Sequence, residues 1–65
     1  MQSFFVAEII PFPGNIYQRI ERLSFELESQ AQEQAAKWRA LGHSSQVWKE
    51  TKGYNRVLLH VYPIH

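Results

Sequence analysis

Residues 15–42 read NIYQRIERLSFELESQAQEQAAKWRALG, and the spacing of their apolar side chains decides the predicted fold. These side chains recur at steps of three and four residues and fall on one helical stripe about 120° wide. The stripe consists of Ile16, Ile20, Leu23, Leu27, Ala31, Ala35, Trp38 and Leu41. The spacing predicts one amphipathic helix from Ile16 to Leu41, with Asn15 as its N-cap and Gly42 closing its C-terminal end.

The segments on either side of this helix have the composition of strands. Ser3–Ile10 is rich in Phe, Val and Ile and is apolar on both alternating faces, which predicts a strand covered on both sides. Gln46–Lys52 is a weaker candidate and Arg56–Tyr62 a strong one, and the glycine between them favours a turn. The chain is therefore expected to run β-α-β-β.

These elements predict an α+β fold in which one long amphipathic helix packs on one face of a three-stranded, mostly antiparallel sheet. The last strand is the most apolar, so we expect it in the middle of the sheet, between the first and second strands. A direct β-α-β crossover, with the first two strands adjacent, is the alternative. The helix is expected to cover the face that carries Val57, Leu59 and Val61.

Length and composition limit the classes to which the protein can belong. Its 65 residues suit a single domain, 1–65, and the absence of cysteine excludes disulfides and cysteine-based zinc sites. The net charge of +1 argues against generic binding to polyanions, although residues 1–36 carry a net negative charge and residues 37–65 a net positive charge. The first ten residues have neither a basic start nor a long apolar run, so we expect a cytoplasmic protein without a membrane partner.

The lengths of the predicted elements do not match. A helix of roughly 26 residues spans about 39 Å, whereas strands of roughly seven or eight residues span about 23–27 Å. Either the helix bends over the end of the sheet or a partner supplies the missing cover, and the open face of the sheet needs cover as well. We expect a second copy to supply it, which predicts a homo-oligomer and most simply a two-fold dimer. The residues expected in that interface are Phe4, Val6, Trp38, Leu41, Leu58 and Tyr62.

The polar residues do not form a pattern that is typical of catalysis. His43, His60 and His65 lack the spacing of a metal site, and Ser44 is next to His43 only in sequence. The glutamates of residues 21–33 are expected on the solvated side of the helix, and no glycine-rich phosphate loop is present. We therefore expect no catalytic residue, no metal and no cofactor, and a protein that is not an enzyme.

Aromatic and basic side chains interleave near the C-terminus. They are Trp48, Lys49, Lys52, Tyr54 and Arg56. A basic hairpin of this kind could stack bases and hold phosphates, which makes a nucleic-acid-binding module the alternative function. The simpler interpretation is that lysines protect an edge strand and aromatic side chains fill a small core. The low net charge favours the simpler interpretation.

Phe25 does not fit the helical stripe, because it lies about 140° from the centre of that stripe. An apolar side chain on the solvated side of a helix is either a single exposed residue or a contact to another protein. We expect Phe25 to be such a contact. The function that the sequence favours is a small non-catalytic protein-interaction or regulatory module that acts as a homo-oligomer.

Overall fold

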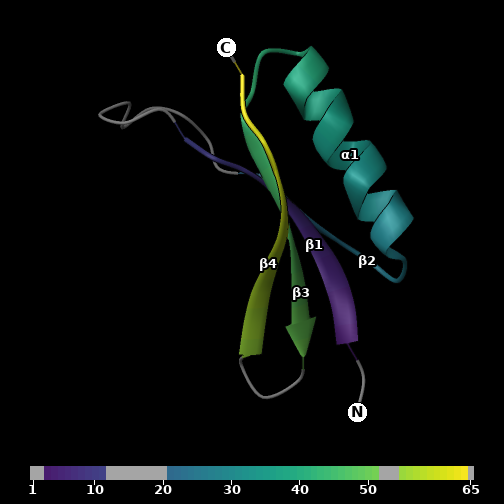
Figure 1. Cartoon of the computed structure of the whole chain (residues 1–65). Coiled ribbons are helices and arrows are strands. Elements are labelled where there is room, and N and C mark those ends of the chain that lie inside the picture. Colours follow the sequence, from purple (N-terminus) through teal and green to yellow (C-terminus); the bar gives the residue numbers. More distant parts are fainter. Residues whose placement is uncertain (1–2, 12–20, 52–54, 65) are drawn as a thin grey trace.

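The computed structural model describes residues 3–11, 21–51 and 55–64. In these residues four strands and one helix follow one another along the chain (Figure 1). They are β1 (Ser3–Ile9), β2 (Arg22–Phe25), α1 (Glu28–Ala40), β3 (Ser45–Thr51) and β4 (Asn55–Tyr62). One helix packs against one face of an antiparallel sheet, which confirms the predicted α+β class. The sheet has four strands rather than three.

The additional strand, β2, comes from the sequence that was predicted to be the first half of the helix. Arg22–Phe25 pairs antiparallel with β1, with Phe25 opposite Phe5 and Leu23 opposite Ala7. The predicted helix is therefore wrong over these residues, and its expected N-cap, Asn15, lies outside the described part of the chain. Leu23 and Phe25 alternate with polar residues, so the segment fits a strand as well as a helix, and pairing with β1 decides between them.

The helix α1 has 13 residues and ends at Ala40, one residue before the predicted end at Leu41. At its start the Gln30 side-chain carbonyl accepts a hydrogen bond from the Leu27 backbone N–H, at 3.2 Å. Lys37 lies in the last turn, where a cation interacts favourably with the helix dipole. Gly42 follows with φ of +90°, a conformation that costs glycine little and other residues more.

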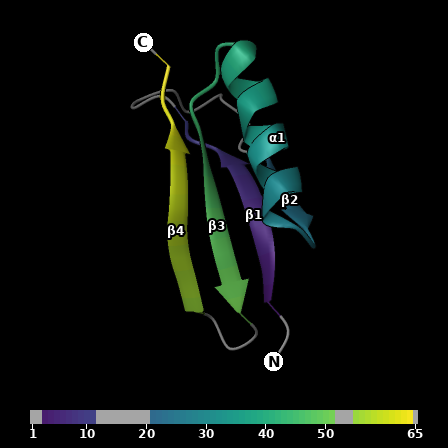
Figure 2. The same ribbon diagram turned by 45° about the vertical axis from the view of Figure 1, so that its right-hand side comes forward.

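The strand order is β2-β1-β3-β4, so the last strand lies at an edge and not in the middle (Figure 2). The first strand and Ser45–Thr51 are adjacent, but they run antiparallel and are not the neighbours of a direct β-α-β crossover. Both predicted arrangements are therefore wrong. The reason is β2, which reverses the chain before the helix, so that α1 connects two parallel strands on opposite sides of β1.

The core lies between α1 and the two central strands. Its buried side chains are Ala7, Ile9, Ala31, Ala35, Trp38 and Val47. The two helix alanines are fully buried, and their small side chains let the helix backbone lie close to the sheet. The buried Ser45 hydroxyl donates a hydrogen bond of 2.8 Å to the Ala35 carbonyl, which ties β3 to the helix without leaving a polar atom unpaired.

An irregularity in the pairing of β3 with β4 changes which β4 side chains face the helix. Val47 is opposite His60 and Trp48 is opposite Leu58, so Leu59 is an extra residue in β4. Side chains beyond this bulge are turned to the other face of the sheet. His60 and Tyr62 consequently lie on the α1 side. The predicted buried face is wrong in part, because Leu59 packs on the core but Val57 and Val61 are exposed.

The helix is not too long for its sheet. Thirteen residues span about 20 Å, which is less than the roughly 23–27 Å of the longer strands. Trp38 is only 5% exposed within the single chain, whereas Leu41, the C-cap residue, is 73% exposed. An overhanging helix is therefore not a reason to expect a homo-oligomer, and self-association stays a prediction.

Truncation of these two side chains should have very different effects, although both belong to the same sequence stripe. We expect Trp38→Ala to lower the free energy of unfolding by about 3–5 kcal/mol because it empties part of the core. Leu41→Ala should change it by less than about 0.5 kcal/mol. Urea unfolding followed by circular dichroism measures both. Similar losses for the two variants would contradict the position of Trp38 in the core.

Candidate functional site

Four charged side chains meet on the face of the sheet that is opposite α1, and each comes from a different strand. Arg22 of β2 pairs with Glu50 of β3, and Arg56 of β4 pairs with Glu8 of β1. Arg56 Nε also lies 3.0 Å from a Glu50 carboxylate oxygen. These four residues, which we call the ion-pair network, surround a hollow of about 270 Å³. The two glutamate side chains are mostly buried in it, and their charges are balanced by the two arginines.

The ion-pair network covers the middle of the open face. In register, Glu8 is opposite Arg22, Val6 is opposite Trp48, and Phe4 is opposite Glu50. The pair between Arg22 and Glu50 therefore crosses the row that contains Val6. Val6 is fully buried, although among residues 3–11, 21–51 and 55–64 no helix covers its face. Because arginine stems are apolar and the Arg22–Glu50 pair crosses this row, we infer that the ion-pair network contributes to the cover of Val6.

The Arg56 side chain also lies over the indole of Trp48 on the open face. Its guanidinium carbon lies 4.1 Å from the centroid of the Trp48 ring, which is the geometry of a cation–π interaction. The guanidinium thus contacts two carboxylates and one aromatic ring of its own chain. It therefore lies against groups of its own chain, although the Arg56 side chain is still 41% exposed.

The edge strand β4 presents a different surface. Within the described residues β4 pairs only with β3, so one side of its backbone has no ladder partner there. Val57, Leu58 and Val61 are 57%, 44% and 50% exposed. A strand of eight residues with a free backbone edge and exposed apolar side chains favours pairing with another strand. We call this surface the β4 edge.

The six residues predicted for a self-association surface do not lie together. Phe4 and Leu58 are on the open face, and both are partly or largely exposed. Val6 is on the same face beneath the ion-pair network, and Trp38 is in the core. Tyr62 packs on the core from the α1 side, stacked on His60 at a ring-centroid distance of 6.3 Å. Sequence reasoning missed Val57 and Val61 because it assigned both to a buried face.

The residues predicted for nucleic-acid binding are also separated. Trp48 and Arg56 are on the open face, whereas Lys49 is opposite Phe5 and Val57 on the α1 side. Lys52 and Tyr54 lie outside the described residues. Since the Arg56 guanidinium already pairs with carboxylates, the described residues of this set do not form one basic surface.

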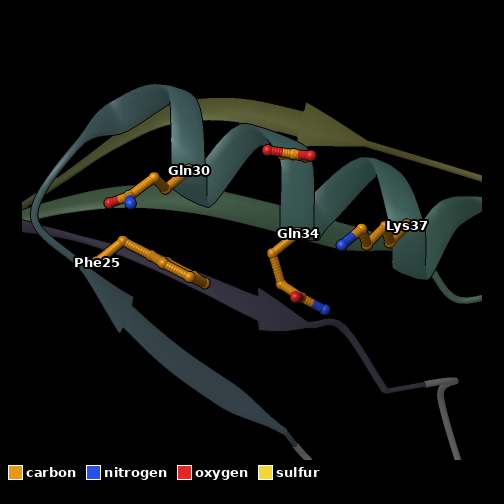
Figure 3. A pocket seen from close by; sticks show the side chains of 5 residues that line it. Phe25, Gln30, Gln34 and Lys37 are labelled. Atoms are coloured by element: carbon orange, nitrogen blue, oxygen red, sulfur yellow. The ribbon is translucent and has the colours of Figure 1, made fainter.

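Phe25 is on β2 and its side chain lies beside α1, partly buried against the core (Figure 3). It borders a hollow of about 210 Å³ at the side of the helix, with polar residues on the remaining walls. These residues are Gln30, Glu33, Gln34 and Lys37. The proposed contact of Phe25 with another protein stays a prediction, and any such contact would use the groove between α1 and β2.

A polar contact joins β4 to the start of the helix. His60 Nε2 lies 2.8 Å from the side-chain nitrogen of Gln32 and 3.3 Å from a carboxylate oxygen of Glu28.

No group of three acidic or histidine side chains within residues 3–11, 21–51 and 55–64 is arranged to hold a metal ion. In the same part of the chain, no helix is long and apolar enough to cross a membrane.

Comparisons with known proteins give no relative from which a function could be transferred. A scan of protein-family models, a search of curated proteins and a search of solved structures each found no match to the chain. A proposal for its function therefore rests on the geometry of the chain itself.

Loss of Arg56 should weaken the fold and uncover Trp48. We expect Arg56→Ala to lower the free energy of unfolding by about 1–2 kcal/mol, because it removes two ion pairs and the cation–π contact. Acrylamide quenching of tryptophan fluorescence should increase, and the increase reports Trp48 because Trp38 is buried. Arg39→Ala, at an exposed position of α1, is the control and should change neither quantity appreciably. Equal effects of the two substitutions would show that the ion-pair network does not cover the open face.

Proposed function

We propose that the protein is a small non-catalytic protein-interaction module that acts as a homo-oligomer, most simply a two-fold dimer, through the β4 edge. The observation that carries this proposal is the combination of a strand edge that pairs with no other described strand and three exposed apolar side chains on the same strand. The opposite edge, β2, is only four residues long, so it offers less backbone for pairing. Among the edges of the described sheet, β4 is the better suited to association.

Energetics support pairing at this edge. A chain of 65 residues buries only about 60% of the surface of its unfolded form, so its stability as a monomer is limited. Full burial of a Val or Leu side chain is worth roughly 1.5–3 kcal/mol, and part of that gain is available at Val57, Leu58 and Val61 of each copy. Unpaired backbone groups of β4 would gain ladder hydrogen bonds at the same time. These gains oppose the entropy lost on association.

The middle of the open face has little free apolar surface for association, which also supports the proposal. Its charged side chains are paired within the chain, and its central apolar residue is already buried. An association driven by apolar burial therefore has more to gain at the β4 edge than on the open face. The absence of a catalytic role stays part of the proposal.

A charged residue at the β4 edge should abolish the association. We expect the unmodified chain to dimerise with a Kd at or below about 10 μM, which corresponds to about 7 kcal/mol. Leu58→Lys should give a monomer, because pairing would bring the lysine charge against the apolar side chains of the other copy. Sedimentation velocity over a range of concentrations measures both.

Leu23→Lys is the matched control, because Leu23 is 46% exposed on the other edge strand and Leu58 is 44% exposed on β4. The control should dimerise as the unmodified chain does. A compact monomer of the unmodified chain at all concentrations, or equal loss of dimer in both variants, would contradict the β4 edge as the association surface.

A further inference from the structure

We infer that β4 pairs antiparallel with β4 of a second copy, in the register that places Leu58 opposite Val61 of that copy. This inference rests on the proposed function and specifies its geometry. The two four-stranded sheets then form one continuous sheet of eight strands. The partner at the edge is a second copy because the side chains of β4 can be matched to those of the same strand read in the opposite direction.

The bulge at Leu59 decides which registers are acceptable. Arg56, Leu58 and Val61 lie on the open face, and Val57, His60 and Tyr62 lie on the α1 face. Side chains that are directly opposite one another on paired strands must lie on the same face. Most two-fold registers break this rule, because the bulge shifts the alternation between the two halves of β4. Only two registers that overlap over six or more residues satisfy it at every pair outside the bulge.

These two registers differ in the chemistry of the opposed side chains. One places Val57 opposite His60 of the second copy and Arg56 opposite Val61, so each exposed valine meets a polar or charged residue. The other places Leu58 opposite Val61 and Val57 opposite Tyr62. In the second register all three exposed apolar residues of β4 gain apolar neighbours, and apolar cross-strand pairs are worth about 0.2–1 kcal/mol each.

The position of Arg56 also favours the second register. Its guanidinium lies over Trp48 and pairs with Glu8 and Glu50, so it is directed across its own sheet. In the first register it would have to cover Val61 of the second copy, which requires it to leave these contacts. In the second register Arg56 lies beyond the last apolar pair and keeps them.

The symmetry of this pairing determines which elements lie on each face of the dimer. A two-fold axis perpendicular to the continuous sheet leaves both helices on one face and both ion-pair networks on the other. The open faces of the two copies become a single surface, with Leu58 and Val61 of each copy at its centre. The β2 strands form the two outer edges of the dimer.

Disulfide trapping tests the register directly, because the chain contains no cysteine. We expect the double variant Leu58→Cys/Val61→Cys to form a covalent dimer rapidly on mild oxidation, since opposed residues have Cα atoms about 4.5–5.5 Å apart. Leu58→Cys alone should crosslink slowly, because the bulge leaves the two copies of this position offset by two ladder positions, about 7 Å along the strands. Val57→Cys/His60→Cys is the control for the first register. Non-reducing electrophoresis and intact mass give the crosslinked fraction.

The possible outcomes distinguish failure of this inference from failure of the proposed function. Sedimentation of the cysteine-free chain gives the oligomeric state independently of any crosslink. If the chain is a dimer and the Val57/His60 variant crosslinks fastest, the register is wrong but association at the β4 edge holds. If the chain is a dimer and none of the three variants crosslinks, β4 is not at the interface. A monomer at all concentrations overturns both the inference and the proposed function.

Discussion

The pairing of β1 with a strand on each side is the constraint on which the rest of the structure depends. β1 is the strand whose sequence is apolar on both faces, and it is the strand that lies between β2 and β3. Its Ala7 and its Val6 face opposite sides of the sheet and are both fully buried. Because β1 and β3 take the two central positions, β4 is left at an edge with apolar side chains that its own chain does not cover.

The two faces of β1 are covered in different ways. On one face the alanines of α1 allow close packing of helix on sheet, with Trp38 filling the remaining space. On the other face no helix or strand of the described residues forms a second layer, and there the Arg22–Glu50 pair crosses the row of Val6 while the Arg56 guanidinium lies over Trp48. Ion pairs of solvent-exposed arginines contribute only about 0–1 kcal/mol each, so we infer that the apolar stems of Arg22 and Arg56 add to what the ion-pair network contributes on this face.

Sequence reasoning recovered the α+β class, the strand at each end of the chain and the end of the helix at Gly42. It failed at β2 because Leu23 fits both a helical stripe and an alternating strand, and only long-range pairing with β1 decides between them. Phe25 carried the missing signal, because it fits the strand pattern and lies off the helical stripe. The bulge at Leu59 could not be predicted from the sequence either, since it depends on how β3 and β4 pair. The ion-pair network joins residues as far apart as Glu8 and Arg56, which no local pattern connects.

Residue-resolved amide hydrogen exchange, measured by NMR at low and high protein concentration, tests the central position of β1 and the edge position of β4 most directly. Amides along β1 should exchange slowly at both concentrations, since β1 is paired on both sides. In β4, the amides directed away from β3 should exchange rapidly in dilute solution and slow down as the concentration rises. Uniformly slow exchange along β4 at every concentration, together with rapid exchange at alternate positions of β1, would place β4 in the middle of the sheet and contradict the fold described.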